Sequence, residues 1–277
     1  GQKEIAILKM LNEADPEDTK HVVRMRGSFT HRGHLGIVFE SLDINLREVL
    51  RKYGAGKGIS MEGVRLYAKH LLLSLHLLSR CNLVHADLKP DNILATKDRT
   101  SIKLCDFGSA TFVEEDCELT PYLVSRFYRA PEVILGLPYG TAVDMWSLGC
   151  CLYELYTGKI AFPGKHNNAM LKLFQDMKGP IPSKMVRKAT LGHKHFEGDK
   201  FLQIDVDPVS RLEVVRKVTV PDKPKVVLRD VVLRAAESSE RRSAALLADL
   251  LDKMFALDPS RRLSVKDALK HAFFQNT

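Results

Sequence analysis

The first forty residues carry one helical and two extended patterns of apolar side chains. Apolar residues three positions apart predict an amphipathic helix over residues 2–12, which ends at the dipeptide Asp15-Pro16. Two apolar runs at residues 22–29 and 34–40 then predict strands. The polar turn between them ends in Gly33, which is typical of a hairpin.

The rest of the chain is mainly helical in its pattern. Helical spacing of apolar residues predicts helices near residues 46–50, 64–78, 142–156, 244–255 and 265–273. The segment 142–156 is apolar on most faces and contains the only tryptophan, so it predicts a buried central helix. Gly54, Gly56 and Gly58 follow the first of these helices. Since no strand precedes them, a flexible linker is favoured over a phosphate-binding loop.

Two segments between the helices have a different composition. Residues 82–132 are dense in polar clusters, with short apolar runs at 92–95 and 102–105, which indicates a loop-rich site supported by short strands. Residues 178–234 hold 13 Lys or Arg against 7 Asp or Glu, together with several prolines. This segment predicts an irregular basic insertion.

Composition excludes several classes of protein. The 277 residues are 45% hydrophobic and 27% charged, which fits a globular protein with a sizeable core and not a disordered chain. No apolar run approaches the roughly 18 residues of a membrane span, so no membrane partner is expected. Five cysteines without a CxxC pair predict neither a disulfide framework nor a zinc site, and favour a reducing compartment. The net charge of +8 favours acidic partners, phosphate or nucleic acid.

The strongest candidate chemistry lies in three short motifs. His85 to Asn92 reads HADLKPDN, Asp106 begins DFG, and Ala130 begins APE. Transfer of a phosphoryl group to a hydroxyl needs an acceptor for the hydroxyl proton and a cation beside the migrating group. It also needs hard oxygen ligands for Mg²⁺. Carboxylate, lysine and amide side chains within these motifs supply all three.

In this order and at this spacing the motifs resemble those of the protein kinase family. The resemblance implies ATP and Mg²⁺ as cofactors. Asp87 would orient the substrate hydroxyl and accept its proton, and Lys89 would reach the transferring phosphoryl group. Asn92 and Asp106 would be the metal ligands.

The resemblance also implies the fold: α+β and bilobal, with a truncated small N-terminal lobe and a complete, mainly helical C-terminal lobe. Residues 1–40 would be the remnant of the N-terminal lobe, with helix C and two strands. Residues 41–277 would be the hinge and the C-terminal lobe, including the basic insertion at about 178–234. The C-terminal lobe would therefore carry the catalytic residues.

The adenine site is assigned by the same resemblance. Phe39 would be the bulky gatekeeper, the backbone of Glu40 and Leu42 would bond adenine, and Leu94 would form its floor. Glu4 matches the helix glutamate that pairs with a strand lysine. That lysine and the Gly-rich loop are not in this sequence, so we expect a fragment of an active kinase, inactive on its own. The alternative is a pseudokinase, a docking module without turnover.

Other motif residues match structural positions of the family. His85 would be a packed, hydrogen-bonded residue, and Asp144 would brace the catalytic loop. Glu132 and Arg262 would form a pair that joins the end of the activation segment to the late helices. Cys150 and Cys151 are expected to be small core residues.

The subgroup follows from finer matches. Lys89 is typical of Ser/Thr kinases, and the run SRFYRAPE from Ser125 and the basic insertion resemble the CMGC group. Segments such as TPYLVSRFYR are similar to the splicing-associated pre-mRNA-processing kinases. The resemblance implies a nuclear, monomeric catalytic domain that acts on Ser or Thr of spliceosomal proteins. Weak contact with RNA is a secondary expectation from the charge.

One departure bears on regulation. Ala86 replaces the arginine that in many kinases binds a phosphate on the activation segment. By resemblance to the mitogen-activated kinases, Arg126 and Arg129 stand four and seven residues after Tyr122, where two arginines bind phosphotyrosine. The hypothesis is therefore that phosphorylation of Tyr122 activates the protein and that Thr120 is dispensable.

Overall fold

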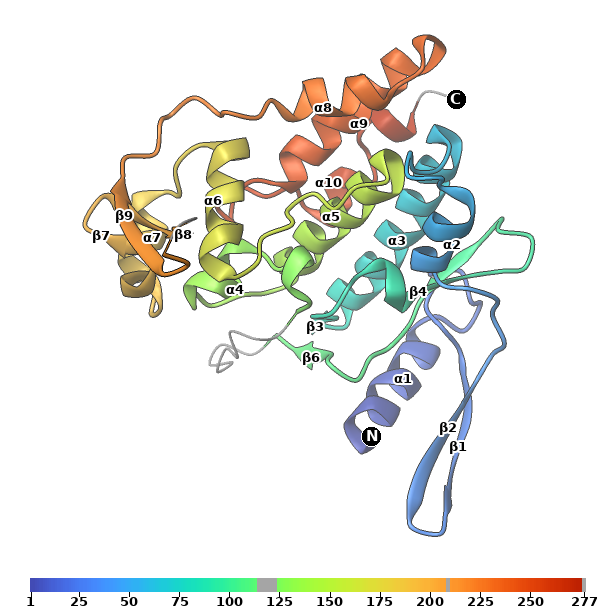
Figure 1. Ribbon diagram of the computed structural model, residues 1–277. Helices are drawn as coiled ribbons and strands as arrows, with labels where there is room; N and C mark the ends of the chain where they lie inside the picture. The colour runs from blue at the N-terminus through green and yellow to red at the C-terminus, as the bar shows by residue number, and fades with distance from the viewer. Residues whose placement is uncertain (114–123, 208–209, 276–277) are drawn as a thin grey trace.

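A helix and a hairpin form the N-terminal part of the computed structural model, which describes residues 1–113, 124–207 and 210–275 (Figure 1). Helix α1 spans Gln2–Ala14, and strands β1 (Met25–His31) and β2 (His34–Phe39) pair antiparallel. The predicted helix and hairpin are confirmed. The turn is two residues long, with φ of 49° at Arg32 and 77° at Gly33. Two positive φ angles in succession give a turn that matches the right-handed twist of the strands. Strand β1 therefore continues to His31, two residues beyond the predicted end at residue 29.

Long helices build the core of the larger part. They are α2 (Leu46–Tyr53), α3 (Met61–Arg80), α5 (Ala142–Thr157) and α9 (Arg241–Met254). Every residue of α5 from Val143 onward is buried, which confirms the predicted central helix. Its Trp146 packs on Phe162, Phe174 and Phe255 with ring centroids 4.8 to 5.5 Å apart. Aromatic packing of this kind holds α5 in place, so that α5 can support the loops between α3 and α5.

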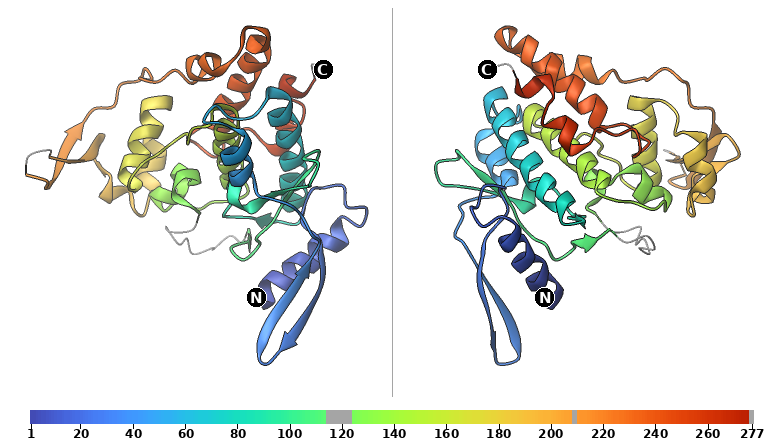
Figure 2. Two further views of the ribbon diagram at one scale, coloured as in Figure 1. Left: turned by 45° about the vertical axis from the view of Figure 1, so that its right-hand side comes forward. Right: turned by 180° about the vertical axis from the view of Figure 1, so that it is seen from behind.

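Short elements between α3 and α5 form the loop-rich segment. Strand β3 (Leu83–Val84) pairs with β6 (Thr111–Phe112), and β4 (Ile93–Ala95) pairs with β5 (Ile102–Leu104). The short helices are η1 (Pro90–Asn92), η2 (Arg126–Tyr128) and α4 (Pro131–Leu135). Figure 2 shows the strands of this segment between the N-terminal part and the helical part, whereas α4 packs beside α6 (Asn167–Lys178) and α7 (Ser183–Lys188). The predicted strands near 92–95 and 102–105 are confirmed.

The glycine segment between α2 and α3 is packed and not a flexible linker. A Cβ atom on Gly58 would lie 2.2 Å from the Tyr156 carbonyl oxygen, and φ at Gly58 is +90°. The next residue, Ile59, donates its N–H to Leu155 O at 2.7 Å. Glycine is required here because the backbone approaches the end of α5 too closely for a side chain.

The basic insertion is ordered, so the prediction of an irregular segment is wrong. It contains the three-stranded antiparallel sheet β7 (Phe196–Glu197), β8 (Lys200–Val206) and β9 (Glu213–Val218). Alternating apolar and polar residues in β8 and β-branched residues in β9 favour this sheet locally, but they are obscured by the charge of the whole segment. Helices α6 and η3 (Gly192–Lys194) contact this sheet, and α7 packs on η3. Helix α8 (Leu228–Ala235) packs instead on α9 and α5.

The C-terminal segment contains shorter helices than expected. The predicted helix over 265–273 is only α10 (Val265–Ala268), followed by η5 (Ala272–Phe274), and η4 (Ser238–Glu240) precedes α9. Ser264 caps α10 by accepting a hydrogen bond from Asp267 N at 3.1 Å. None of the helices in the described residues combines the length and the hydropathy that a membrane span requires.

Candidate active site

The catalytic-loop candidate begins with a buried histidine. His85 is fully buried, its Nε2 lies 2.9 Å from Cys105 O, and its Nδ1 accepts the N–H of Asp87 at 3.2 Å. The ring also packs edge-on against Phe107, with centroids 5.1 Å apart. Both ring nitrogens are therefore used inside the protein, which supports the predicted structural role.

Asp144 braces the same loop from helix α5. Its two carboxylate oxygens accept the backbone N–H groups of His85 at 2.7 Å and Ala86 at 3.1 Å. The pKa of Asp144 is raised above its usual value, because burial outweighs the opposing effect of these two hydrogen bonds. Ala86 has a φ of 63°, a conformation that costs free energy in a non-glycine residue. The predicted brace is present, and it holds this strained turn.

Asp87 is the most tightly held carboxylate of the loop. Its Oδ1 accepts bonds from Ser125 N at 3.1 Å and Ser125 Oγ at 2.8 Å. Its Oδ2 accepts bonds from Lys89 Nζ at 2.7 Å and Asn92 Nδ2 at 3.2 Å. Burial alone would raise the pKa of Asp87, but the hydrogen bonds from Lys89 and Ser125 outweigh it and lower the pKa. At neutral pH the group is an oriented carboxylate.

Ser125 is a site residue that the sequence analysis did not assign. Its hydroxyl donates to Asp87 and accepts a bond from Lys89 Nζ at 3.0 Å. The hydroxyl therefore occupies the space between the carboxylate and the ammonium group. It lies 38 residues after Asp87, and although it begins the run SRFYRAPE, nothing in the local sequence indicates its contact with Asp87.

Asn92 and Asp106 come from neighbouring segments. Asn92 is buried and donates its Nδ2 to Asp87 O at 2.9 Å, which turns its amide oxygen away from that contact. Cys105 N donates to Asn92 O at 2.9 Å, so the residue before Asp106 is tied directly to Asn92. Asp106 is exposed and has a φ of 64°.

This pair has the donor chemistry of a magnesium site. Magnesium prefers oxygen ligands and commonly takes one or two from the protein and the rest from water and phosphate. One carboxylate and one amide oxygen fit that preference. No cluster of three or more His, Cys, Asp or Glu that could hold a metal occurs among the residues that the structure describes.

Glu4 extends from α1 toward the DFG segment. A Cβ atom added to Gly108 would lie 3.3 Å from Asp106 Oδ1 and 3.9 Å from Glu4 Oε2. The two carboxylates therefore face the same space around Gly108. This arrangement is consistent with the assignment of α1 as helix C and of Asp106 as a candidate metal ligand near Glu4.

The hinge candidates lie where the N-terminal part meets β4. Glu40 N donates to Arg24 O at 3.0 Å, so the amide of Glu40 is already bonded within the protein. Leu42 and Leu94 are half-buried, and Phe39 keeps 39% of its surface exposed.

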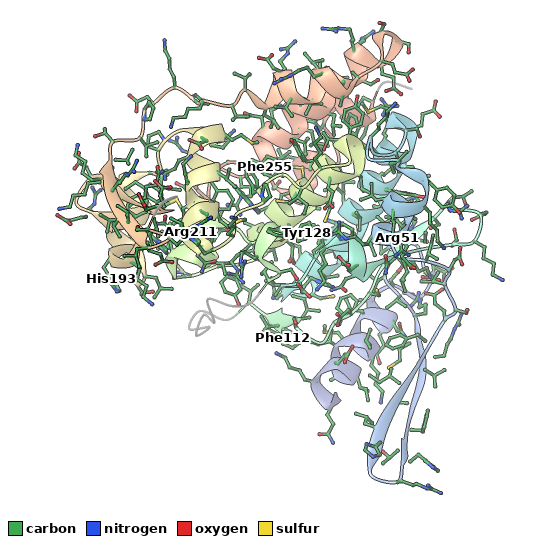
Figure 3. All side chains as sticks on the ribbon, viewed as in Figure 1. Arg51, Phe112, Tyr128, His193, Arg211 and Phe255 are labelled. Carbon is green, nitrogen blue, oxygen red and sulfur yellow. The ribbon has the colours of Figure 1, made fainter. Side chains whose placement is uncertain are left out.

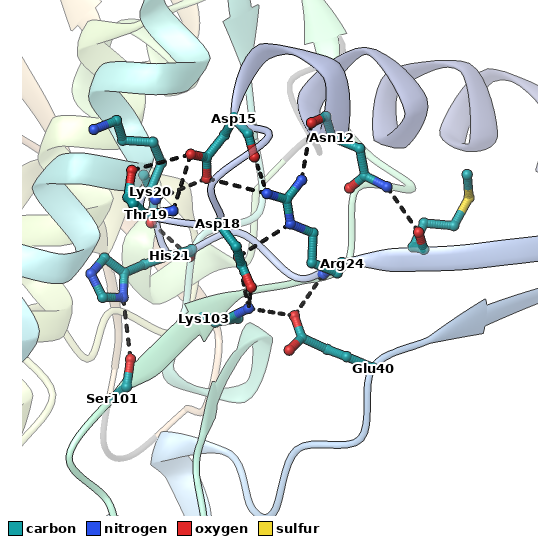
Figure 4. A network of polar contacts seen from close by, with 12 residues as sticks. Asn12, Asp15, Asp18, Thr19, Lys20, His21, Arg24, Glu40, Ser101 and Lys103 are labelled. Atoms are coloured by element: carbon teal, nitrogen blue, oxygen red, sulfur yellow. Dashed lines mark hydrogen bonds and ion pairs between the residues drawn. The ribbon is translucent and has the colours of Figure 1, made fainter.

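A polar network that the sequence did not reveal supports this hinge (Figure 4). Lys103 on β5 is 8% exposed, and its Nζ lies 2.6 Å from Asp18 Oδ2 and 2.7 Å from Glu40 Oε1. Arg24 joins the network through Asp18 Oδ1 at 3.2 Å and through Asp15. One lysine therefore links β5, the hinge and the loop after α1.

The two arginines assigned to phosphotyrosine lie beside the start of α6. Arg129 is 6% exposed and donates to Asn167 Oδ1 at 2.6 Å and to Val124 O at 2.9 Å. Arg126 is less buried and donates to the carbonyl of Lys165. Tyr122 and Thr120 lie outside the described residues.

A second cluster missed by the sequence analysis centres on Tyr128, which Figure 3 labels near the middle of the molecule. The Tyr128 hydroxyl donates to Glu154 Oε2 at 2.6 Å. Arg47 contacts both groups and also Asp91, at 3.3 Å. The cluster fixes the segment after Ser125 against α5 and α2.

Glu132 and Arg262 form the predicted pair. Their side chains are both 0% exposed, with the two oxygen–nitrogen contacts at 2.5 and 2.9 Å. A two-point guanidinium–carboxylate contact of this kind is strongly directional. It joins α4 to the loop that follows α9.

Comparisons with known proteins agree with this geometry. The protein kinase domain model matches residues 2–274, so the chain belongs to the protein kinase domain family. The chain is 45% identical to "Serine/threonine-protein kinase prp4" of Schizosaccharomyces pombe, over 99% of this chain and 58% of that protein. It is 39% identical to "Serine/threonine-protein kinase prpf4B" of Dictyostelium discoideum, over 99% of this chain and 34% of that protein. The human "Dual specificity tyrosine-phosphorylation-regulated kinase 4" is 35% identical, with 99% and 49% covered.

These relatives confirm the resemblance to kinases of the CMGC group and the α+β kinase fold. All three names are those of kinases, so they give no support to the alternative of a docking module without turnover. The chain spans between 34% and 58% of the length of these relatives.

Proposed function

We propose that this protein is a Ser/Thr kinase that transfers the γ-phosphoryl group of ATP to hydroxyl groups of protein substrates. The observation that carries the proposal is the Asp87 carboxylate, ionised and held by Lys89, Asn92 and Ser125. A substrate hydroxyl that enters beside the Ser125 hydroxyl meets a proton acceptor and an ammonium group together. The names of the relatives support serine and threonine as the acceptors.

The remaining residues take complementary roles. Lys89 stabilises negative charge on the migrating group, and Asn92 and Asp106 would hold Mg²⁺ through their side-chain oxygens. When bound, Mg²⁺ would supply positive charge that offsets the charge of the phosphates. Because Asn92 also bonds Asp87, the proton acceptor and the metal ligands keep a fixed relative position.

The adenine and phosphate contacts are assigned to the hinge and to α1. The Glu40 carbonyl and the Leu42 amide bond adenine, while Phe39 and Leu94 flank the ring. Glu4 would pair with a phosphate-binding strand lysine, which is not in this sequence. The support for the role of Glu4 is its approach, together with Asp106, to Gly108.

The decisive experiment compares three aspartates in the full-length protein. Asp87→Asn removes the proton acceptor and Asp106→Asn removes a metal ligand, so each lowers kcat by at least about 100-fold. Asp91→Asn is the matched control, since Asp91 lies in the same loop but its side chain is 43% exposed and contacts Arg47. Turnover is measured with labelled ATP, and folding by thermal unfolding. Near-normal turnover of the Asp87 or Asp106 variant would contradict the proposal.

We also propose that the protein acts in the nucleus, on spliceosomal proteins during pre-mRNA splicing. The motif similarity to the pre-mRNA-processing kinases and the two relatives named prp4 and prpf4B support this role. The net charge of +8 allows weak contact with RNA as a secondary property. Phosphoproteomics after acute inhibition tests the role, and a set of lost phosphosites without splicing factors would count against it.

Activation is assigned to phosphorylation of Tyr122, with Arg126 and Arg129 as the binding groups. Support comes from their position beside α6, on the segment that joins Ser125 to α4. Mass spectrometry of the active protein detects the modification, and activity is compared for Tyr122→Phe and Thr120→Ala. The expected result is loss of activity in the first variant only, and the reverse pattern would refute the assignment.

A further inference from the structure

Strand β9 is the free edge of the sheet in the basic insertion. Its neighbour β8 has both of its edges bonded within the molecule. Leu202 N donates to His195 O at 2.8 Å, and Asn168 bonds Leu202 O at 2.8 Å and Ile204 N at 3.0 Å. Among the described residues, β9 pairs only with β8.

The direction of the backbone groups on β9 follows from this pattern. In an antiparallel ladder, opposite residues direct their N–H and C=O groups either both toward each other or both away. Leu202 and Ile204 direct theirs away from β9, so their register partners Lys217 and Val215 direct theirs away from β8. Glu213 also directs its backbone groups away from β8, because alternate residues of a strand point to the same side. Within the part of the chain that the structure describes, these three residues therefore present unpaired donors and acceptors along the outer edge.

The outer edge is complementary to a second copy of itself. When two β9 strands pair antiparallel about Val215, each Glu213 lies opposite Lys217 of the other copy and Val215 faces Val215. The Val215 side chain is 58% exposed, so the pairing would cover an apolar surface. Opposite charges and β-branched residues in directly facing positions both stabilise a strand pair.

The neighbouring registers are disfavoured by charge. Only residues whose backbone N–H and C=O groups point away from β8 can pair with the second copy. The next possible register on either side therefore moves each strand by one residue relative to the twofold axis. One shift places Arg211 opposite Lys217, and the other places Arg216 opposite its own copy. Like charges in facing positions destabilise a strand pair, so the register centred on Val215 is selected.

In contrast to the monomer that the resemblance implies, we propose that two copies of this chain associate through their β9 edges and form one continuous six-stranded sheet across a twofold axis. The left view of Figure 2 shows the β8–β9 hairpin projecting from the end of the molecule opposite the β1–β2 hairpin, where a second copy has free access. The catalytic residues all come from one chain, so the association leaves each active site complete. A contact of one strand pair is small, and the association is a reversible one.

Charge reversal tests the register. Lys217→Glu or Glu213→Lys places like charges opposite each other at both symmetry-related pairs. Either variant is expected to raise the dimer dissociation constant at least about tenfold, measured by sedimentation equilibrium. The double variant restores both pairs and recovers the dimer. Within one chain Lys217 also contacts Glu197 at 2.5 Å, a pair that the double variant does not restore, so recovery reports on the second copy. Lys223→Glu, an equal charge change outside β9, leaves dimerisation unchanged.

A cysteine cross-link tests the same geometry independently. Facing residues with paired hydrogen bonds have Cα atoms about 5.5 Å apart, within the range of a disulfide. Val215→Cys therefore forms a disulfide-linked dimer under mild oxidation, while Val214→Cys and the unmodified chain do not. A wild-type chain that stays monomeric, a double variant that fails to recover, or equal cross-linking at both positions overturns the proposal. So does a β9 edge that binds an acidic peptide but not a second copy.

Discussion

Ser125 shows how a single hydroxyl can order an active site. It donates to Asp87 Oδ1 and accepts from Lys89 Nζ, so the lysine has two acceptors at 2.7 and 3.0 Å. Without this hydroxyl the ammonium group has one acceptor fewer and Asp87 loses one of the bonds that lower its pKa. Ser125 thus positions the Asp87 carboxylate, the proposed proton acceptor.

We predict that Ser125→Ala lowers kcat by about 10- to 100-fold, because a charge-assisted hydrogen bond is worth about 1.5 to 3 kcal/mol. Ser125→Thr retains the hydroxyl and keeps most of the activity. Steady-state kinetics separates kcat from KM, and the KM for ATP should change little in both variants. Equal activity of the alanine and threonine variants would show that the hydroxyl has no positioning role.

The local motifs made part of the site predictable. Asp87, Lys89 and Asn92 lie within six residues of one another, so their mutual distances are set by one short loop. Ser125 and Lys103 could not be found in this way, because their partners are distant in the sequence and each residue type is common on surfaces. Their roles depend on burial and on contacts that only the folded chain creates.

At the scale of elements, the Lys103 network joins β5, the hinge and the loop after α1 (Figure 4). The lysine side chain is 10% exposed, while Glu40 is 14% and Asp18 36% exposed. Removing one partner from such a buried network leaves the other charges without compensation, which costs more than the pair contributes as a whole.

Lys103→Met is therefore expected to lower the free energy of unfolding by about 2 to 4 kcal/mol. The matched control is Lys200→Met, which removes an exposed pair with Asp199 and costs at most about 1 kcal/mol. Urea unfolding of the two variants measures the difference. Similar small losses in both would show that the hinge network adds no stability.

The elements themselves were predictable where one apolar face dominates. Helices α3 and α5 carry long runs of apolar side chains, and both were predicted. The sheet of the basic insertion was not, because β9 is exposed and charged and its pairing with β8 depends on the register. Helix α10 ends early because the chain turns after Leu269, where Lys270 N donates to Asp267 O at 3.1 Å.

At the scale of the whole molecule, Arg262 joins segments that are far apart in the sequence. Besides Glu132, it donates to the carbonyls of Ala142 at 2.8 Å and Ala256 at 3.1 Å. Its guanidinium group also lies 5.1 Å from the ring centroid of Trp146. The residue therefore connects α4, the start of α5, the core of α5 and the end of α9.

A double-mutant cycle tests how strongly Arg262 and Glu132 are coupled. Arg262→Met leaves the fully buried Glu132 carboxylate unpaired, and we expect a loss of about 3 to 5 kcal/mol in the free energy of unfolding. Glu132→Gln leaves a buried guanidinium group beside a neutral amide and is also destabilising. The double variant has no unpaired carboxylate, so its loss should be smaller than the sum of the two by about 2 kcal/mol.

Arg262→Lys is the control for charge alone. Lysine keeps the positive charge but cannot make the two-point contact with Glu132 or reach both carbonyls from a planar group, so it recovers little of the lost stability. Additive losses in the cycle, measured by urea unfolding, would mean that the two residues act separately. Coupling together with poor rescue by lysine would show that the geometry of the guanidinium group, and not its charge, holds the activation segment to the late helices.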